Sequence, residues 1–228
     1  MRVLFLLFHI TFLASFLFAQ DTLKKVPYSQ DYIFKDGIYI TFNQFIENNP
    51  LPKYKIVSSV PPTSPAYLYE VTQKDTFHYI GDNGYITPYP TKKIWGFSEN
   101  NTVFIQYLNQ FNRIIIIGTI GFFMSQVTVT STIYNDPYYY SSYYNPYYYY
   151  PGINLPHEVK NNEIKRFLID FRTGNVIPFS YKNLEVLLSA DTELYNEYLS
   201  LSKRKRKKMI FLYLRRFNER NPLLLPPN

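Results

Sequence analysis

The sequence contains no cysteine. This absence excludes disulfide bonds, thiol catalysis, cysteine-based zinc sites and a lipid-anchored cysteine. Histidine is scarce too, and outside the apolar N-terminal stretch only His78 and His157 remain. They lie far apart, and the sequence has no metal-spaced His/Asp/Glu cluster, phosphate-binding glycine loop or nucleophile elbow. We therefore predict no catalytic residue, no cofactor and no metal site.

The N-terminus has the composition of a secretory signal peptide. The basic residue Arg2 is followed by an apolar run that ends at the small residue Ala19, before polar residues. This order predicts export, with cleavage near Ala19. An uncleaved membrane anchor is the alternative, but the run is short for a span and His9 interrupts it. We expect residues 1–19 to be removed and residues 20–228 to form a single domain, periplasmic or associated with the outer membrane.

The stretch 94–134 carries the densest apolar surface of the exported part. β-Branched and aromatic residues dominate it, and these residues favour strands over helices. The runs 94–97 and 102–108 predict a hairpin, because asparagine tolerates the backbone conformation of the turn between them. In the run 125–130, polar residues alternate with valine, which predicts a strand with one solvent-facing side.

The run 113–124 is apolar without alternation, so we expect a strand that is covered on both faces. A membrane span is the alternative reading. A helix needs about 20 apolar residues to cross a bilayer, and this run holds only about a dozen. Gly118 and Gly121 would also weaken a helix here.

Further short elements are expected on both sides of this stretch. Thr41 and Gln44 have the spacing of a capping box, which predicts a helix over 42–48. Strands are expected at 38–40, 54–60, 67–71, 77–80, 85–87, 163–170 and 176–179. Glycine-containing turns at residues 81–84 and 170–175 predict two hairpins.

After Ser180 the apolar residues recur at helical spacing, and Asp191 is placed to cap a helix N-terminus. We expect helices over 181–220. Short antiparallel strands in a meander, followed by C-terminal helices, define the α+β class.

Six motifs together resemble a family of uncharacterised secreted proteins from Bacteroidota. They are Asp36-Gly-Ile-Tyr-Ile-Thr-Phe, Trp95-Gly-Phe, Ile120-Gly-Phe-Phe, Asp170-Phe-Arg-Thr-Gly, Asp191-Thr-Glu-Leu-Tyr and Phe217-Asn-Glu-Arg-Asn-Pro. The resemblance covers most of the chain after residue 19. It implies export from a bacterium with two membranes, and it implies no activity, ligand or cofactor.

Six consecutive basic residues form the first candidate binding segment: Lys203, Arg204, Lys205, Arg206, Lys207 and Lys208. At about 100° per residue they go more than once around a helix, so the segment projects into solvent or the helix breaks there. One reading is a solvated stretch that favours solubility. The other is electrostatic binding to an anionic surface, namely anionic lipid, lipopolysaccharide or acidic glycan. Nucleic acid is not favoured as the partner of an exported protein.

The second candidate is a low-complexity segment over 134–156, rich in tyrosine and proline, which we expect to be a long loop. Tyrosine presents a flat ring and a hydroxyl at low entropic cost, so such a loop suits adhesive contact, for example with an envelope protein. A tolerated insertion without function is the alternative. The tyrosines concerned are Tyr138, Tyr139, Tyr140, Tyr143, Tyr144, Tyr147, Tyr148, Tyr149 and Tyr150.

These observations favour a non-enzymatic envelope protein that acts by binding or in a structural role. The alternative is a secreted hydrolase, for example one that cleaves glycans with two carboxylates brought together only by folding.

Overall fold

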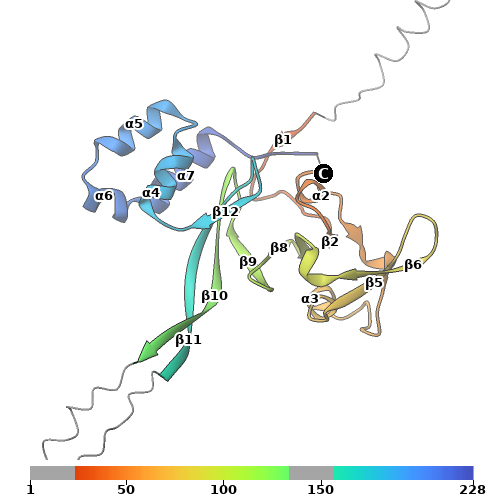
Figure 1. Ribbon diagram of the computed structural model, residues 1–228. Helices are drawn as coiled ribbons and strands as arrows, with labels where there is room; N and C mark the ends of the chain where they lie inside the picture. The colour runs from red at the N-terminus through yellow and green to blue at the C-terminus, as the bar shows by residue number, and fades with distance from the viewer. Residues whose placement is uncertain (1–23, 134–156, 228) are drawn as a thin grey trace, which may run out of the picture.

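The computed structural model describes residues 24–133 and 157–227 (Figure 1). The expected signal peptide and the tyrosine-rich segment lie outside the described residues. The described part is α+β, as predicted, with an antiparallel sheet followed by C-terminal helices.

Within the described ranges, eight strands form the main sheet. In order across the sheet they are β12 (Asn175–Pro178), β11 (His157–Asp170), β10 (Ile120–Ile133), β9 (Gln110–Ile116), β8 (Thr102–Tyr107), β7 (Gly96–Glu99), β2 (Gly37–Tyr39) and β3 (Leu51–Pro52). The strands from β7 to β12 are neighbours in both sequence and space, which confirms the antiparallel meander.

Two smaller sheets accompany the main one. A three-stranded sheet consists of β4 (Ile56–Val57), β5 (Thr76–Ile80) and β6 (Ile86–Pro90). A two-stranded sheet pairs β1 (Val26–Pro27) with β13 (Leu224–Leu225), so the two ends of the described chain lie side by side.

The helices of the described residues fall into two groups. Short ones connect the strands: α2 (Phe42–Ile46), α3 (Tyr67–Thr72) and the 3₁₀ turns η2 (Lys53–Lys55) and η3 (Thr91–Lys93). The C-terminal group, called here the helical layer, comprises α4 (Tyr181–Leu188), α5 (Thr192–Ser200), α6 (Lys203–Lys208) and α7 (Ile210–Arg220). No helix in the described part of the chain has the length and hydropathy needed to cross a membrane.

The buried side chains form three clusters, and the central strands contribute to two of them. Neighbouring residues of a strand point to opposite faces of the sheet. Phe123 accordingly packs in an aromatic cluster with Phe45 and Phe171, whereas Phe122 packs against the helical layer. The third cluster lies between α3, the three-stranded sheet and the Phe97 side of β7.

The predicted continuous strand over 113–124 is wrong in detail, because the run bends at 117–119 and divides into β9 and β10. The only continuous buried stretch of this run is 118–123, and the sheet is covered on both faces at residues 120–123. Ile115 is 50% exposed and Met124 is 44% exposed, so the expectation of two covered faces fails at these positions.

The segment 67–71 is also not a strand but helix α3. Its first free N–H groups, those of Leu68 and Tyr69, donate to the carboxylate of Glu99 at 3.0 and 3.4 Å. Glu99 lies at the end of β7, so a distant residue supplies the cap that local sequence lacks. Of the predicted strand 54–60, only Ile56 and Val57 are in strand conformation.

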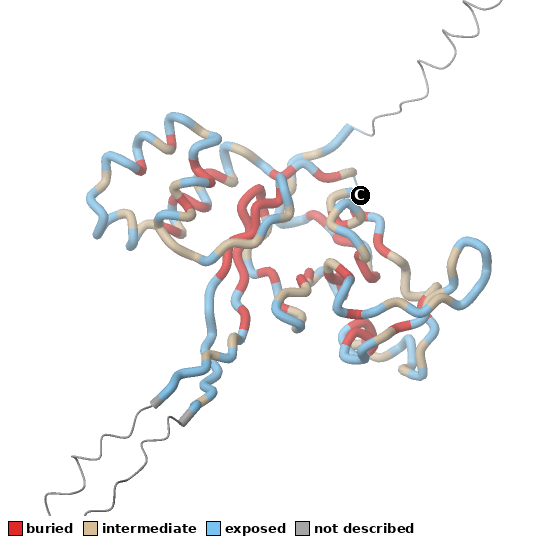
Figure 2. The backbone as a smooth tube through the Cα atoms, viewed as in Figure 1, coloured by how far each residue is buried: buried red, intermediate tan, exposed pale blue. Residues whose placement is uncertain are grey.

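Beyond the core, β10 and β11 continue as a two-stranded arm (Figure 1). Their pairing runs from Ile120 with Asp170 to Ile133 with His157. The outer half of this arm is mostly exposed (Figure 2), and the tyrosine-rich segment connects its two strands in sequence.

Candidate functional site

The helical layer carries most of the protein's net positive charge. The chain has a formal net charge of +7, and residues 181–220 contribute ten basic and five acidic side chains to it. Four of the five carboxylates form ion pairs with three arginines: Glu185 with Arg206, Glu197 with Arg216, and both Asp191 and Glu193 with Arg220. The acidic residues of this layer are therefore used for joining helices.

The six predicted basic residues form helix α6, a separate short helix. Ser202 caps its N-terminus by accepting a hydrogen bond from the Lys205 N–H, and Met209 separates it from α7. None of the six is buried. Both structural expectations for this segment, projection into solvent and a break in the helix, are confirmed.

One of the six, Arg206, differs from the others. Its guanidinium lies 2.5 Å from the Glu185 carboxylate and 5.6 Å from the centre of the Tyr181 ring. Its backbone carbonyl accepts a hydrogen bond from the Tyr198 hydroxyl at 3.1 Å. Arg206 therefore holds α6 against α4 and α5, and its guanidinium is already paired within the protein.

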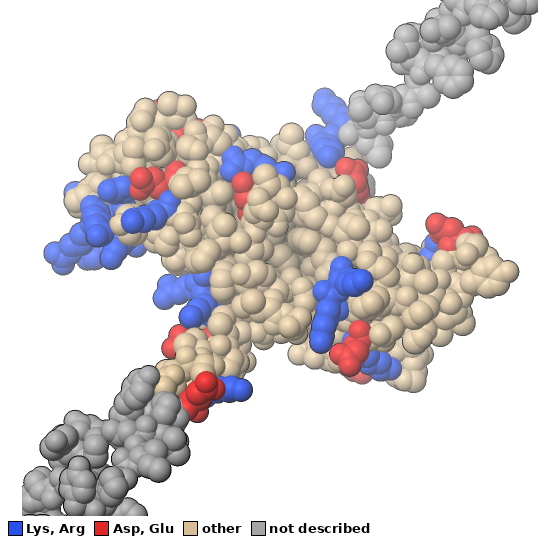
Figure 3. Space-filling model, in the orientation of Figure 1, with Lys and Arg blue, Asp and Glu red and all other residues tan. Residues whose placement is uncertain are grey.

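The remaining cations of α6 are exposed to solvent: Lys203, Arg204, Lys205, Lys207 and Lys208. Among the described residues, no carboxylate lies within ion-pair distance of any of them. Only Lys207 has a close aromatic neighbour, with its Nζ 5.8 Å from the centre of the Tyr181 ring. Figure 3 shows Lys and Arg side chains gathered at this end of the helical layer.

A further exposed cation, Arg166, comes from β11 of the sheet. The guanidinium of Arg166 lies 5.7 Å from the centre of the Phe179 ring. The Phe179 ring in turn lies 4.9 Å from the ring of Phe211, at the start of α7 and three residues after Lys208. We call the five exposed cations of α6 together with Arg166 the basic surface.

Next to Arg166 the molecule has an open groove of about 580 Å³. Phe167, Pro178 and Phe179 line it together with Lys165 and Arg166. Lys165 is less available to an external anion than Arg166, because its Nζ lies 3.8 Å from the Glu163 carboxylate.

Sequence reasoning missed Arg166, Phe179 and Tyr181, because they are far from α6 in sequence. Only folding brings Tyr181 against α6, Phe179 against the start of α7, and Arg166 over Phe179. The predicted tyrosine-loop residues 138–150 lie outside the described residues. His78 is exposed on β5. Among the described residues no group of three or more His, Asp or Glu side chains could hold a metal ion.

A second groove, of about 540 Å³, bears on the hydrolase alternative because it contains Asp36 and Asp82. Each carboxylate is held by a lysine, with Lys53 Nζ 3.0 Å from Asp36 and Lys55 Nζ 2.8 Å from Asp82. The hydrogen bond from Lys55 lowers the pKa of Asp82. A glycosidase acid needs a raised pKa. The groove therefore does not favour that chemistry.

Comparisons with protein-family models, curated proteins and solved structures find no match to this chain.

Proposed function

We propose that this chain is an exported cell-envelope protein that binds anionic, phosphate-bearing lipid surfaces through its basic surface. One observation carries the proposal. Five cations of α6 have no carboxylate partner among the described residues, although most acidic residues of the same helical layer are paired with arginines. The charge of α6 is thus available to an external partner.

The strength of such binding follows from the number of cations. A lysine or arginine close to an anionic membrane contributes about 1 kcal/mol. Five of them contribute about 5 kcal/mol, which corresponds to a factor of roughly 10³ to 10⁴ in the binding constant. The attraction is screened over about 8 Å at physiological ionic strength, so high salt should release the protein.

The groove beside Arg166 favours a lipid over an acidic glycan. An anionic lipid combines a phosphate with acyl chains, and the lining of the groove combines two cations with the apolar residues Pro178 and Phe179. A glycan offers the charge without the acyl chain. Lipopolysaccharide shares both features with phospholipids, so these two sources must be separated by experiment.

The test is co-sedimentation of the purified protein with phosphatidylcholine vesicles that contain or lack phosphatidylglycerol. The test variant replaces the five exposed cations of α6 with glutamine and keeps Arg206. A control variant removes the same number of positive charges elsewhere on the surface. It replaces five other exposed basic residues with glutamine: Lys24, Lys74, Lys93, Arg113 and Lys160.

We expect the wild type to bind only the anionic vesicles, with release at high salt. The α6 variant should bind about 10³-fold more weakly, while the control variant should stay within a few-fold of the wild type. Vesicles with lipid A and a soluble polyuronate, as separate arms, identify the source of the anion. Equal weakening of both variants would show that net charge alone is responsible, and wild-type binding by the α6 variant would refute the proposal.

A further inference from the structure

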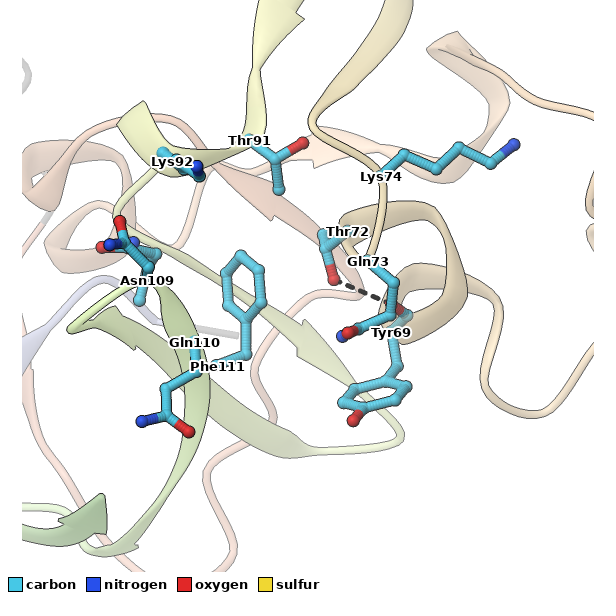
Figure 4. A pocket seen from close by; sticks show the side chains of 10 residues that line it. Tyr69, Thr72, Gln73, Lys74, Thr91, Lys92, Asn109, Gln110 and Phe111 are labelled. Atoms are coloured by element: carbon cyan, nitrogen blue, oxygen red, sulfur yellow. Dashed lines mark hydrogen bonds between the residues drawn. The ribbon is translucent and has the colours of Figure 1, made fainter. Parts of the chain in front are cut away.

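A separate pocket lies away from the basic surface, between α3 and the β8–β9 hairpin (Figure 4). Its volume is about 260 Å³. Drug-sized ligands occupy about 300–1,000 Å³, so this pocket has room for one small ring. Three elements line it: the end of α3, the turn η3 and the hairpin.

The hairpin supplies an amide and an aromatic ring on one face. Gln106 of β8 and Phe111 of β9 are directly opposite each other in the strand pairing, so their side chains are neighbours. The turn between these strands consists of Leu108 and Asn109, both with positive φ, of 54° and 60°. This tight turn places Asn109 in the lining close to Gln106.

Helix α3 supplies the opposite wall. Tyr69 is 45% exposed, so much of its ring is open to solvent. Gln73, at the C-terminal cap of the helix, reaches toward the hairpin (Figure 4). The Thr72 hydroxyl donates to the Tyr69 carbonyl at 2.9 Å, which fixes the end of the helix.

Three of the polar side chains that line the pocket are neutral amides without a hydrogen-bond partner. In the described part of the chain, the side-chain amides of Gln73, Gln106 and Asn109 form no hydrogen bond with the protein. Each amide both donates and accepts hydrogen bonds, as a sugar hydroxyl does. The rings of Tyr69 and Phe111 add flat apolar area beside them.

Charge contributes little to the interior. No Asp or Glu is among the described lining residues. Lys74 bonds to Ser59 at 3.3 Å and points away from the pocket in Figure 4. Lys92 lies 4.0 Å from the Asp75 carboxylate. Both lysines thus have a partner outside the lining, and the other described polar side chains of the lining are neutral.

We infer that this pocket binds one neutral sugar ring, such as a terminal hexose or N-acetylhexosamine of a glycan. The three free amides bind the hydroxyl groups, and the aromatic rings pack against the C–H face of the ring. This site is independent of the lipid-binding basic surface, since no residue belongs to both.

Saturation-transfer NMR with glucose, galactose, mannose and N-acetylglucosamine tests this site, with glucuronic acid as the acidic comparison. The purified wild-type protein should transfer saturation to at least one neutral sugar. The double variant Gln73→Ala and Gln106→Ala should weaken that binding at least tenfold. A matched double variant, Gln126→Ala with Asn161→Ala, removes two exposed amides from the arm and should bind as the wild type does.

Two further variants test the role of the ring. Tyr69→Phe should retain binding within a few-fold, whereas Tyr69→Ala should lose it, with an unchanged circular dichroism spectrum in both. The absence of saturation transfer to all neutral sugars would refute the site. So would unchanged binding by the Gln73/Gln106 variant, or binding of the acidic sugar alone.

Discussion

The side-chain amide of Asn218 pairs with the backbone of Ile120 as a neighbouring strand would. Asn218 Oδ1 accepts a hydrogen bond from the Ile120 N–H, and Asn218 Nδ2 donates to the Ile120 carbonyl, both at 2.8 Å. Ile120 is fully buried at the start of β10, whereas Asn218 lies on α7. Gly118 leaves the space for this amide, because a Cβ there would collide with Asn218. One side chain thus joins the helical layer to the sheet.

Replacing Asn218 with alanine should lower the free energy of unfolding by about 2–4 kcal/mol. The reason is that a buried N–H and a buried carbonyl each lose their partner, at about 1–3 kcal/mol apiece. Urea unfolding followed by circular dichroism measures the change. Asn161→Ala, on the exposed arm, is the control and should change stability by less than about 0.5 kcal/mol. Equal effects of the two substitutions would contradict the assigned role.

Glu99→Gln should destabilise the protein by about 1.5–3 kcal/mol, the usual value of hydrogen bonds to a charged group. Glu99 is 6% exposed, caps α3 and lies 3.3 Å from Lys53 Nζ. Chemical denaturation measures the loss. Glu70→Gln on the exposed side of α3 serves as the control, and a Glu99 variant as stable as that control would show that the cap is dispensable.

Arg206→Ala and Lys205→Ala should differ although the residues are adjacent. Arg206 loses its ion pair with Glu185 and its contact with Tyr181, so we expect a loss of about 1–3 kcal/mol. Lys205 is exposed, and its replacement should change stability by less than about 0.5 kcal/mol. Thermal unfolding distinguishes the two. Similar stability of both variants would remove the distinction drawn between Arg206 and the rest of α6.

The free energy of unfolding should fall at low pH because the Glu197 carboxylate becomes protonated. Hydrogen bonds from Arg216 and Tyr213 lower the pKa of Glu197 to about 2, from an ordinary value of 4.5. A carboxyl whose pKa is lowered by folding stabilises the folded state above its unfolded pKa. That contribution is therefore complete above about pH 5 and disappears as the pH falls toward 2.

The urea midpoints of the wild type and Glu197→Gln, measured from pH 7 to pH 2, test this dependence. The difference between the two urea midpoints should be constant above about pH 5. It should shrink toward zero as Glu197 becomes protonated at lower pH. Glu219→Gln is the control, since Glu219 is exposed and forms no ion pair among the described residues. A difference that does not change with pH would exclude Glu197 as the titrating group.

Leu108→Asn should stabilise the protein by about 1 kcal/mol. Leu108 has a φ of 54° and is 49% exposed, and a non-glycine residue in this left-handed region costs about 1–2 kcal/mol. Asparagine tolerates this conformation better. Leu199→Asn is the matched control, because Leu199 is 37% exposed but lies within α5, so its replacement should not stabilise. Calorimetry measures the stability change of both variants. A loss of stability in Leu108→Asn would contradict the assignment of backbone strain to Leu108.

The sequence alone determined the elements whose signals are local. Thr41 and Gln44 form the predicted capping box, and Asp191 caps α5 by accepting from the Leu194 N–H. The hairpin turns at residues 81–84 and 170–175 are confirmed as well. These contacts involve residues at most six apart, so the residue types at that spacing are sufficient to specify them.

Tertiary structure decided whatever depends on distant residues. Segment 67–71 becomes a helix because Glu99 reaches it from β7, which local strand propensity does not reveal. Six similar basic residues differ because, among them, only Arg206 forms an ion pair, with Glu185 of α4. The sugar-sized pocket likewise exists only where α3 meets the β8–β9 hairpin. The physical reason is that burial and pairing arise between elements, and a side chain's partners are set only when those elements pack.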